Sequence, residues 1–459
     1  MDKYLYGASL QGLQEFIFKT NKLKEIIGAS EIIKGFDEID FKKEFSLQDA
    51  PEIILQAAGN VRMIFENVDD VKKIVKYLPK KMMEKAFGIT LSQSVVKLDS
   101  YAEASFKLEQ NLKIQRNKNL LPLDLHESAF GINPKTGLPA VCVKAGDFYD
   151  KASLQKTEAY NEAKAKDRSL ENLNIKNAKN KIAIIHIDGN GLGGIVRELQ
   201  KQDIREFSKT LDKATKEAYK KAEGSCLRDE TDSKKIRKVI LGGDDVTLIC
   251  SADIALDFTY SFLKNFEKNT KNIYKNRSLS ACAGIAYCNE KFPFFYAVKL
   301  AENLCAYAKK HSKAIKEDLP PSSLMFHNIQ SSNVESFAKF IADELVINGV
   351  CCDFGPYYID NSPRIKDFLA LKQDFQKKNS PKGRLRDWLN TLKVDRNHAN
   401  AELKRIDEIF APKWKSENFE KLYSGLSLGH LIIKDNGIEK TPIYDILQIL
   451  SVEDFKEEE

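Results

Sequence analysis

The chain has 459 residues, of which 42% are hydrophobic and 30% are charged, with a formal net charge of +6. This length predicts about three domains, and the mild basicity suits nucleotide phosphates without requiring nucleic acid. The eight cysteines lack framework spacing, no apolar run approaches the about twenty residues of a membrane span, and no signal peptide is expected. We therefore expect a cytoplasmic protein of several domains, with neither a disulfide scaffold nor a membrane partner.

Residues 1–120 are predicted to form a first domain. A strand is expected at Tyr4–Leu10, and a hairpin at Ile53–Phe65 carries Gly59 and Asn60 at its turn. A second, similar set of elements is predicted further along the chain.

The region 121–175 is predicted to be a small module and linker. It contains His126, Cys142 and a turn at Asn133–Pro139. One cysteine and one histidine do not fill a tetrahedral structural zinc site, so we predict no zinc here. Lys151–Asn180 is polar and lysine-rich, which indicates an exposed helix and a linker.

Residues 176–330 are predicted to form a second domain. The expected elements are a strand (181–188), a helix (203–222), a hairpin (236–251), a helix (254–271), a strand (Leu279–Tyr287), a helix from Pro293 towards His311, and a short strand (Ser323–His327). Strand, helix, hairpin, helix, strand is the ferredoxin-like arrangement, on which polymerase palms and nucleotide cyclases are built.

The remaining residues, 331–459, show helical spacing and few strand signals. Helices are expected at Ser331–Val350, Arg364–Lys378, Pro381–Leu392 and His398–Ile409. The fold class predicted for the whole chain is therefore α+β: two ferredoxin-like domains followed by a C-terminal helical domain.

Three aspartates form the main candidate site. Gly242 and Gly243 suit a tight hairpin turn that presents Asp244 and Asp245, while Asp188 ends a buried strand that can face this turn. Carboxylates are the ligands that Mg²⁺ prefers, and phosphoryl transfer needs divalent ions about 3.5–4 Å apart. The pattern predicts two Mg²⁺ (or Mn²⁺) ions. The alternative is a turn without function, because Gly and Asp are common turn residues.

A glycine motif follows the strand that ends at Asp188. Gly189, Gly191 and Gly194 match G-x-G-x-x-G, the dinucleotide-binding fingerprint. That fingerprint requires a second parallel strand, whereas a helix and a hairpin follow here. The preferred interpretation is that the backbone amides of Gly189, Asn190, Gly191 and Leu192 approach triphosphate oxygens.

Several stretches together resemble the polymerase-like large subunit of type III CRISPR effector complexes and the related minimal CRISPR polymerases. The matching stretches are Gly7–Phe18, Asn21–Ser30, Asp188–Gly193, Leu241–Asp245, Leu279–Ile285, Ala301–Lys309 and Ser323–His327. The resemblance implies two palm domains that face each other with nucleotides between them, and a C-terminal domain that contacts neighbouring subunits and RNA. Larger members carry an HD nuclease domain. None is expected here, since the sequence has no His-Asp dipeptide.

The first palm is predicted to be a degenerate copy of the second. Gln11, Gly59 and Asn60 stand where an active copy would carry acids. Without carboxylates this copy cannot hold two metal ions. A scaffold role is favoured, with nucleotide binding as the alternative.

Four further features have two readings each. In related cyclases a lysine at the position of Lys309 reaches the triphosphate, and Lys310 is a second candidate; both could instead offset a helix dipole. His186 lies in an apolar strand and is interpreted as a satisfied core histidine. The aromatic cluster Phe292–Tyr296 is interpreted as core rather than as a base-stacking platform.

The resemblance and the acids together predict a nucleotidyltransferase that converts ATP or another NTP into 3′–5′ linked, cyclic oligonucleotide or dinucleotide signals in antiviral defence. Gly242 and Gly243 would leave room for the nucleotide. The alternatives are a catalytically silent nucleotide- or RNA-binding scaffold of a ribonucleoprotein complex, and a cyclase in signalling unrelated to defence. Expected partners are the NTP, RNA and other effector subunits, with a homodimer as a further option.

Overall fold

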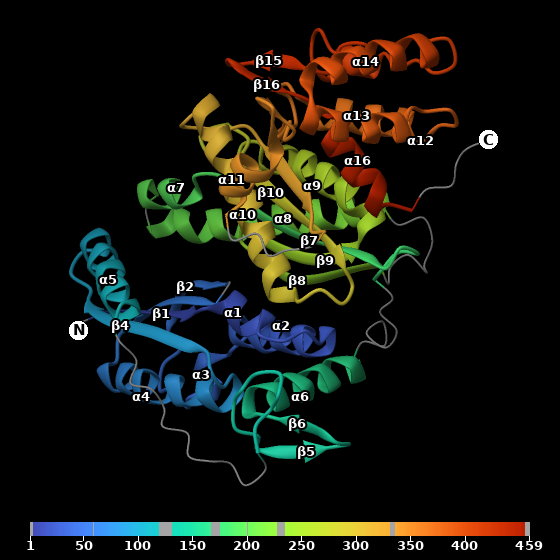
Figure 1. Cartoon of the computed structure of the whole chain (residues 1–459). Coiled ribbons are helices and arrows are strands. Elements are labelled where there is room, and N and C mark those ends of the chain that lie inside the picture. Colours follow the sequence, from blue (N-terminus) through green and yellow to red (C-terminus); the bar gives the residue numbers. More distant parts are fainter. Residues whose placement is uncertain are drawn as a thin grey trace.

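The computed structural model describes residues 3–57, 59–118, 131–166, 175–199, 201–226, 235–330 and 336–454. Figure 1 shows the first palm and a small module on one side, the second palm in the middle, and the C-terminal helices packed on its far side. Within the described residues, no helix has the length and apolar character needed to cross a membrane.

The first palm is a four-stranded antiparallel sheet in the order β2-β3-β1-β4. Its strands are β1 (Tyr4–Gln11), β2 (Glu52–Ala57), β3 (Asn60–Phe65) and β4 (Thr90–Lys97). Its helices are α1 (Leu13–Phe18), α2 (Leu23–Asp37), α3 (Phe41–Glu44), α4 (Val68–Lys85) and α5 (Tyr101–Arg116). The predicted strand and hairpin are confirmed.

The second palm has a six-stranded sheet in the order β14-β11-β10-β7-β9-β8. Its strands are β7 (Lys181–Gly189), β8 (Ile236–Gly242), β9 (Asp245–Ser251), β10 (Ala281–Asn289), β11 (Ser323–Asn328) and β14 (Tyr357–Tyr358). Its helices are α7 (Leu192–Glu198), α8 (Lys201–Cys226), the short 3₁₀ turn η3 (Ala252–Ile254), α9 (Ala255–Thr270) and α10 (Phe294–Ile315).

The two palms share one strand order, which confirms the predicted duplication. β10-β7-β9-β8 in the second palm corresponds to β4-β1-β3-β2 in the first, and both follow the ferredoxin-like order. Both neighbours of β7 are antiparallel to it. The dinucleotide-binding alternative is therefore wrong, because that fold needs a parallel strand beside the glycine motif.

Between the palms, the chain forms a small module. It consists of β5 (Cys142–Lys144), β6 (Asp147–Tyr149) and α6 (Lys151–Lys166). Helix α6 packs closely on α2, because Gly28 leaves room for the carbonyl of Lys156. His126 lies outside the described residues.

The C-terminal part is mainly helical, as predicted. Its helices are α11 (Phe337–Phe340), the π-type turn η4 (Ile341–Leu345), α12 (Ile365–Gln376), α13 (Lys382–Val394), α14 (Arg396–Phe410), α15 (Asn418–Leu422) and α16 (Ile443–Val452). The helix expected to reach Val350 is wrong beyond Leu345. There the chain turns at Asn348 and Gly349, both with positive φ, and forms a small sheet of β12 (Val346–Ile347), β13 (Val350–Cys351), β15 (Ile433–Asp435) and β16 (Ile438–Lys440).

Two sets of contacts hold these units around the second palm. From the first palm, the Ser30 hydroxyl of α2 donates to the carbonyl of Val239 in β8, and Glu31 lies 3.7 Å from Arg237. From the C-terminal part, Gln448 Oε1 of α16 accepts from the backbone N–H of Asn328 in β11 at 3.0 Å, and the carbonyl of Val452 accepts from Asn177 Nδ2 at 2.7 Å. The second palm is thus fixed from both sides.

Candidate active site

The sheet register brings the three aspartates together. Ile187 of β7 pairs with Val246 of β9, so the next residues, Asp188 and Asp245, continue opposite each other. Directly opposed residues of antiparallel strands have neighbouring side chains. Asp244 precedes Asp245 in the turn, and the structure therefore confirms the predicted proximity of the acids.

The turn between β8 and β9 differs in detail from the expected one. Gly242 pairs with Asp245 and belongs to the ladder, so the two turn residues are Gly243 and Asp244. Gly243 has φ of 62°, and Asp244 does not have a positive φ, as in a type II′ hairpin turn. The Thr215 hydroxyl of α8 donates to the carbonyl of Gly243 at 2.6 Å, which fixes the turn.

Gly189 is needed because Asp244 packs directly against its backbone. A Cβ on Gly189 would lie 2.8 Å from Asp244 Oδ2 and 2.4 Å from Leu192 Cδ1. Leu192 itself is a buried residue at the start of α7. The glycine that sequence analysis assigned to a phosphate loop therefore has a first role in bringing the hairpin acids next to Asp188.

The loop from Gly189 to Leu192 only partly fits its predicted role. Asn190 is buried, its backbone N–H donates to the carbonyl of Ser280 at 2.9 Å, and its Nδ2 donates to Ser280 Oγ at 3.0 Å. The backbone amide of Asn190 is therefore not available to bind phosphate, and the predicted phosphate contact of Asn190 is wrong. Gly191, with φ of 69°, leads into α7, and the amides of Gly191 and Leu192 remain candidates.

Lys309 joins the acid site from α10. Its Nζ lies 2.5 Å from Asp188 Oδ2 and 2.8 Å from the carbonyl oxygen of Gly189. The helix continues to Ile315, so Lys309 does not lie at its end and the dipole alternative is wrong. Lys310 is exposed, and among the described residues no contact joins it to the acids.

The two hairpin acids carry raised pKa values that follow from burial and from the nearby charge of Asp188. Burial and the charge of Asp188 raise the pKa of Asp245 to about 7 and that of Asp244 to about 6. The positive charge of Lys309 lowers the pKa of both groups and so opposes these shifts. Burial lowers the pKa of His186 to about 4, so His186 is neutral at pH 7 and does not offset these negative charges.

His186 is a close neighbour of the hairpin acids. Its Nδ1 is 3.1 Å from the hydroxyl of Thr247 and 3.6 Å from Asp245 Oδ1. The prediction of a satisfied core histidine is confirmed by its burial and its hydrogen bond. Its position beneath Asp245 was not predicted.

The residues of the acid site suit divalent cations that bind together with a nucleotide. Asp245 Oδ1 is buried and has no hydrogen-bond partner, which is costly for a carboxylate unless a cation approaches it. Among the described residues, no three acidic, imidazole or thiol groups converge as a ready ligand set. Asp188 is paired with Lys309. Mg²⁺ is commonly held by one or two carboxylates plus substrate phosphates, and this arrangement suits that mode.

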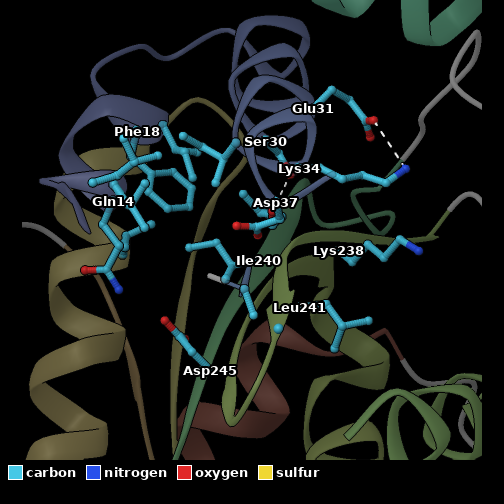
Figure 2. A pocket seen from close by; sticks show the side chains of 18 of the residues that line it. Gln14, Phe18, Ser30, Glu31, Lys34, Asp37, Lys238, Ile240, Leu241 and Asp245 are labelled. Atoms are coloured by element: carbon cyan, nitrogen blue, oxygen red, sulfur yellow. Dashed lines mark hydrogen bonds and ion pairs between the residues drawn. The ribbon is translucent and has the colours of Figure 1, made fainter. Parts of the chain in front are cut away.

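A cavity of about 860 Å³ lies between the two palms and reaches Asp245. In Figure 2, Gln14, Phe18 and Lys34 of the first palm face Lys238, Leu241 and Asp245 of the second. This volume lies in the range of about 300–1,000 Å³ that is usual for small-molecule sites.

Two residues of α10 line this cavity, of which Glu302 was not predicted and Phe295 was interpreted as core. Glu302 lines it and has a buried Oε1 without a hydrogen-bond partner, and burial raises its pKa to about 7. Phe295 also lines the cavity and is 41% exposed. The neighbouring Tyr296 is 40% exposed. The interpretation of Phe292–Tyr296 as core is therefore wrong for these two rings. The seven-residue spacing of Phe295, Glu302 and Lys309 on one helix face was a usable signal.

Comparison with known proteins identifies the second palm. Residues 181–317 match the family model described as Cas10/Cmr2, second palm domain. No curated protein gives a significant match. The resemblance noted in the sequence is thus confirmed.

Solved structures of Csm1–Csm4 assemblies share the fold of the chain. The cassette in complex with pppApApA matches with a TM-score of 0.57 and 13% identity, and the complex with cA4 with 0.53 and 13%. The Csm1–Csm4 subcomplex of the type III-A CRISPR-Csm interference complex matches with 0.54 and 14%. In each case the match covers 98% of this chain and 69% of that chain.

Proposed function

We propose that this chain, which resembles the polymerase-like large subunits of type III CRISPR complexes and contains a Cas10/Cmr2-type second palm, is a metal-dependent nucleotidyltransferase. It would join ATP into 3′–5′ linked, cyclic oligoadenylates that act in antiviral defence. The adenine base is proposed because structural neighbours bind pppApApA and cA4. Effector subunits are proposed partners, because a structural neighbour is the Csm1–Csm4 subcomplex of a CRISPR-Csm interference complex. RNA is a further proposed partner, from the resemblance to type III large subunits.

The proposed reaction is a phosphoryl transfer. The 3′-hydroxyl of one nucleotide gives its proton to water and its oxygen forms a bond to the α-phosphorus of the next. The bond from that phosphorus to the oxygen of the β-phosphate breaks, and pyrophosphate leaves with the electron pair. Two Mg²⁺ or Mn²⁺ ions, when bound, would activate the hydroxyl and neutralise the developing charge. Asp188, Asp244 and Asp245 would hold them.

The other residues of the site have roles that follow from their contacts. Lys309, which is paired with Asp188, would leave this carboxylate and bind the triphosphate once metal ions occupy the acids. The amides of Gly191 and Leu192 would bind phosphate oxygens. Gly242 and Gly243, which lack side chains, would leave space for the nucleotide beside the hairpin.

The observation that carries the proposal is the unpartnered oxygen of Asp245 beside two further carboxylates. A scaffold has no physical need for three crowded acids, two of which, Asp244 and Asp245, have pKa values raised by burial and by the nearby charge of Asp188. The cost is explained if cations bind between them during catalysis.

Mass spectrometry of the products tests the proposal. The protein is incubated with each NTP and Mg²⁺ or Mn²⁺, with and without added RNA, beside the variant Asp244→Ala, Asp245→Ala. The matched control is Asp318→Ala, which removes an exposed aspartate after α10. We expect a cyclic adenylate product from the wild type and the control only. No product under any condition, together with retained ATP binding, would establish the silent scaffold instead.

A further inference from the structure

The turn at Asn133–Gly137 in the small module is held by two side chains that accept from backbone amides. The N–H of Lys135 donates to Asn133 Oδ1 at 3.0 Å, and the N–H of Leu138 donates to Thr136 Oγ1 at 3.3 Å. Gly137 follows with φ of 71°. The side chains of Asn133 and Thr136, three residues apart, are thus both held by amides two residues further on.

A second pair of side chains stands at the first turn of α6. Asp150 precedes the helix and caps it, since its Oδ1 accepts from the N–H of Ser153 at 2.9 Å. Asp150 and Ser153 are again three residues apart. The hairpin of β5 and β6 joins the two pairs.

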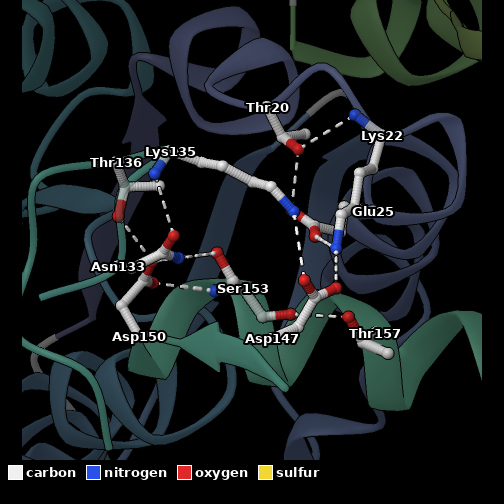
Figure 3. A network of polar contacts seen from close by, with 10 residues as sticks. All are labelled: Thr20, Lys22, Glu25, Asn133, Lys135, Thr136, Asp147, Asp150, Ser153 and Thr157. Atoms are coloured by element: carbon white, nitrogen blue, oxygen red, sulfur yellow. Dashed lines mark hydrogen bonds and ion pairs between the residues drawn. The ribbon is translucent and has the colours of Figure 1, made fainter. Parts of the chain in front are cut away.

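All four side chains meet at one carboxylate oxygen. Asp150 Oδ2 accepts from Asn133 Nδ2 at 2.7 Å, from Thr136 Oγ1 at 2.7 Å and from Ser153 Oγ at 2.9 Å (Figure 3). Asn133, Asp150 and Ser153 are each at most 5% exposed. Burial alone would raise the pKa of Asp150, but these hydrogen bonds lower it below its usual value, so the carboxylate stays charged.

This geometry has the plan of a structural zinc site without zinc ligands. Two pairs with two intervening residues each, one on a turn and one at a helix start, match the C-x₂-C spacing of such sites. The donor chemistry does not fit the metal, because an amide NH₂ and two hydroxyls point at a carboxylate and no thiolate or imidazole is present among the four. A divalent cation at the centre would oppose the N–H and O–H groups that now surround Asp150.

We propose that Asn133, Thr136, Asp150 and Ser153 form a hydrogen-bonded replacement for a tetrahedral zinc site, with Asp150 Oδ2 as the common acceptor in place of the shared metal. The cluster holds the module together, and the module lies against the first palm. There, Lys22 of the palm bonds Asp147 of β6 at 2.8 Å, and Lys156 of α6 donates to the carbonyl of Phe16. The module thereby supports α1 and α2, which line the cavity between the palms.

Asp150→Asn tests the role of the common acceptor. Asparagine caps helices as well as aspartate does, so the cap at Ser153 is kept while Oδ2 is replaced by a donor or a weaker acceptor. The matched control is Asp395→Asn at the N-cap of α14. The side chain of Asp395 accepts from the backbone N–H groups of Asn397 and His398. We expect Asp150→Asn to lower the unfolding temperature by several degrees and Asp395→Asn to change it little. Equal effects would overturn the proposal.

A four-cysteine variant tests the zinc-site plan itself. Asn133→Cys, Thr136→Cys, Asp150→Cys and Ser153→Cys, produced with zinc, should bind one Zn²⁺ and, after exchange, show the visible absorption of tetrahedral Co²⁺ thiolate. The control places the fourth cysteine at Ala152 instead of Ser153, and should lose this spectrum. A folded four-cysteine variant that binds no Co²⁺ would contradict the proposal, as would wild-type protein that retains one zinc per chain and is destabilised by EDTA.

Discussion

At the scale of single residues, the acids of the hairpin should make metal binding depend on pH near neutrality. The pKa of Asp245 is raised to about 7 and that of Asp244 to about 6. Both groups are increasingly deprotonated as the pH rises from 6 to 8, so Mn²⁺ affinity should increase over this window by roughly tenfold or more. Ordinary carboxylates with pKa values near 4 would give no change there. Titration of Mn²⁺ by electron paramagnetic resonance measures this, with Asp245→Asn as the variant that should flatten the profile.

Lys309 should oppose metal ions and favour nucleotides. Its ammonium lies 2.5 Å from Asp188 Oδ2, where it competes with a divalent cation. Lys309→Met should therefore raise the affinity for Mn²⁺ alone at pH 8. It should lower the affinity for ATP with metal by about tenfold or more, the size of a lost charged hydrogen bond. Calorimetric titration with each ligand checks both signs. Lys310→Met serves as the control, and equal changes in the two variants would refute a specific role for Lys309.

At the scale of elements, Gly189 should be essential to the meeting of β7 with the hairpin. An alanine there would place its Cβ 2.8 Å from Asp244 Oδ2 and 2.4 Å from Leu192 Cδ1, so the turn or α7 must shift. Gly189→Ala should lower Mn²⁺ affinity at least tenfold while circular dichroism stays close to wild type. Gly193→Ala is the matched control, because it meets nothing within 4 Å and lies in a helix, where alanine is favoured. Unchanged Mn²⁺ binding by Gly189→Ala would refute the close-approach argument.

The elements of the palms were predictable from the sequence because their apolar periodicity is strong. β7, α8, β9 and α10 all lie where the pattern placed them. The C-terminal strands were missed because β12, β13, β15 and β16 have only two or three residues each, too few for a period to appear. Asn348-Gly349 was nevertheless a readable hairpin signal. At the site, the acids were predictable from the turn chemistry, whereas the engaged amide of Asn190 and the exposure of Phe295 depend on tertiary packing.

At the scale of the whole molecule, the cavity between the palms bears on the predicted scaffold role of the first palm. A scaffold needs only the contacts of α2 with β8, such as Glu31 with Arg237. The cavity of about 860 Å³, however, is lined by both palms and reaches Asp245, which favours a nucleotide held from the first palm. A substitution that fills the cavity without touching the acids distinguishes these two roles.

Ala57 of β2 lines the cavity on the side of the first palm, and Ala57→Trp should fill part of it. We expect product formation and the binding of a second ATP to fall at least tenfold, while Mn²⁺ affinity at the acids stays unchanged, because the tryptophan occupies only the space between the palms. Val75→Trp, on the outer face of α4 where Val75 is 36% exposed, controls for the added ring. If Ala57→Trp leaves the product yield unchanged with the fold intact, the first palm is a scaffold, and the substrate that attacks must be held by the second palm alone.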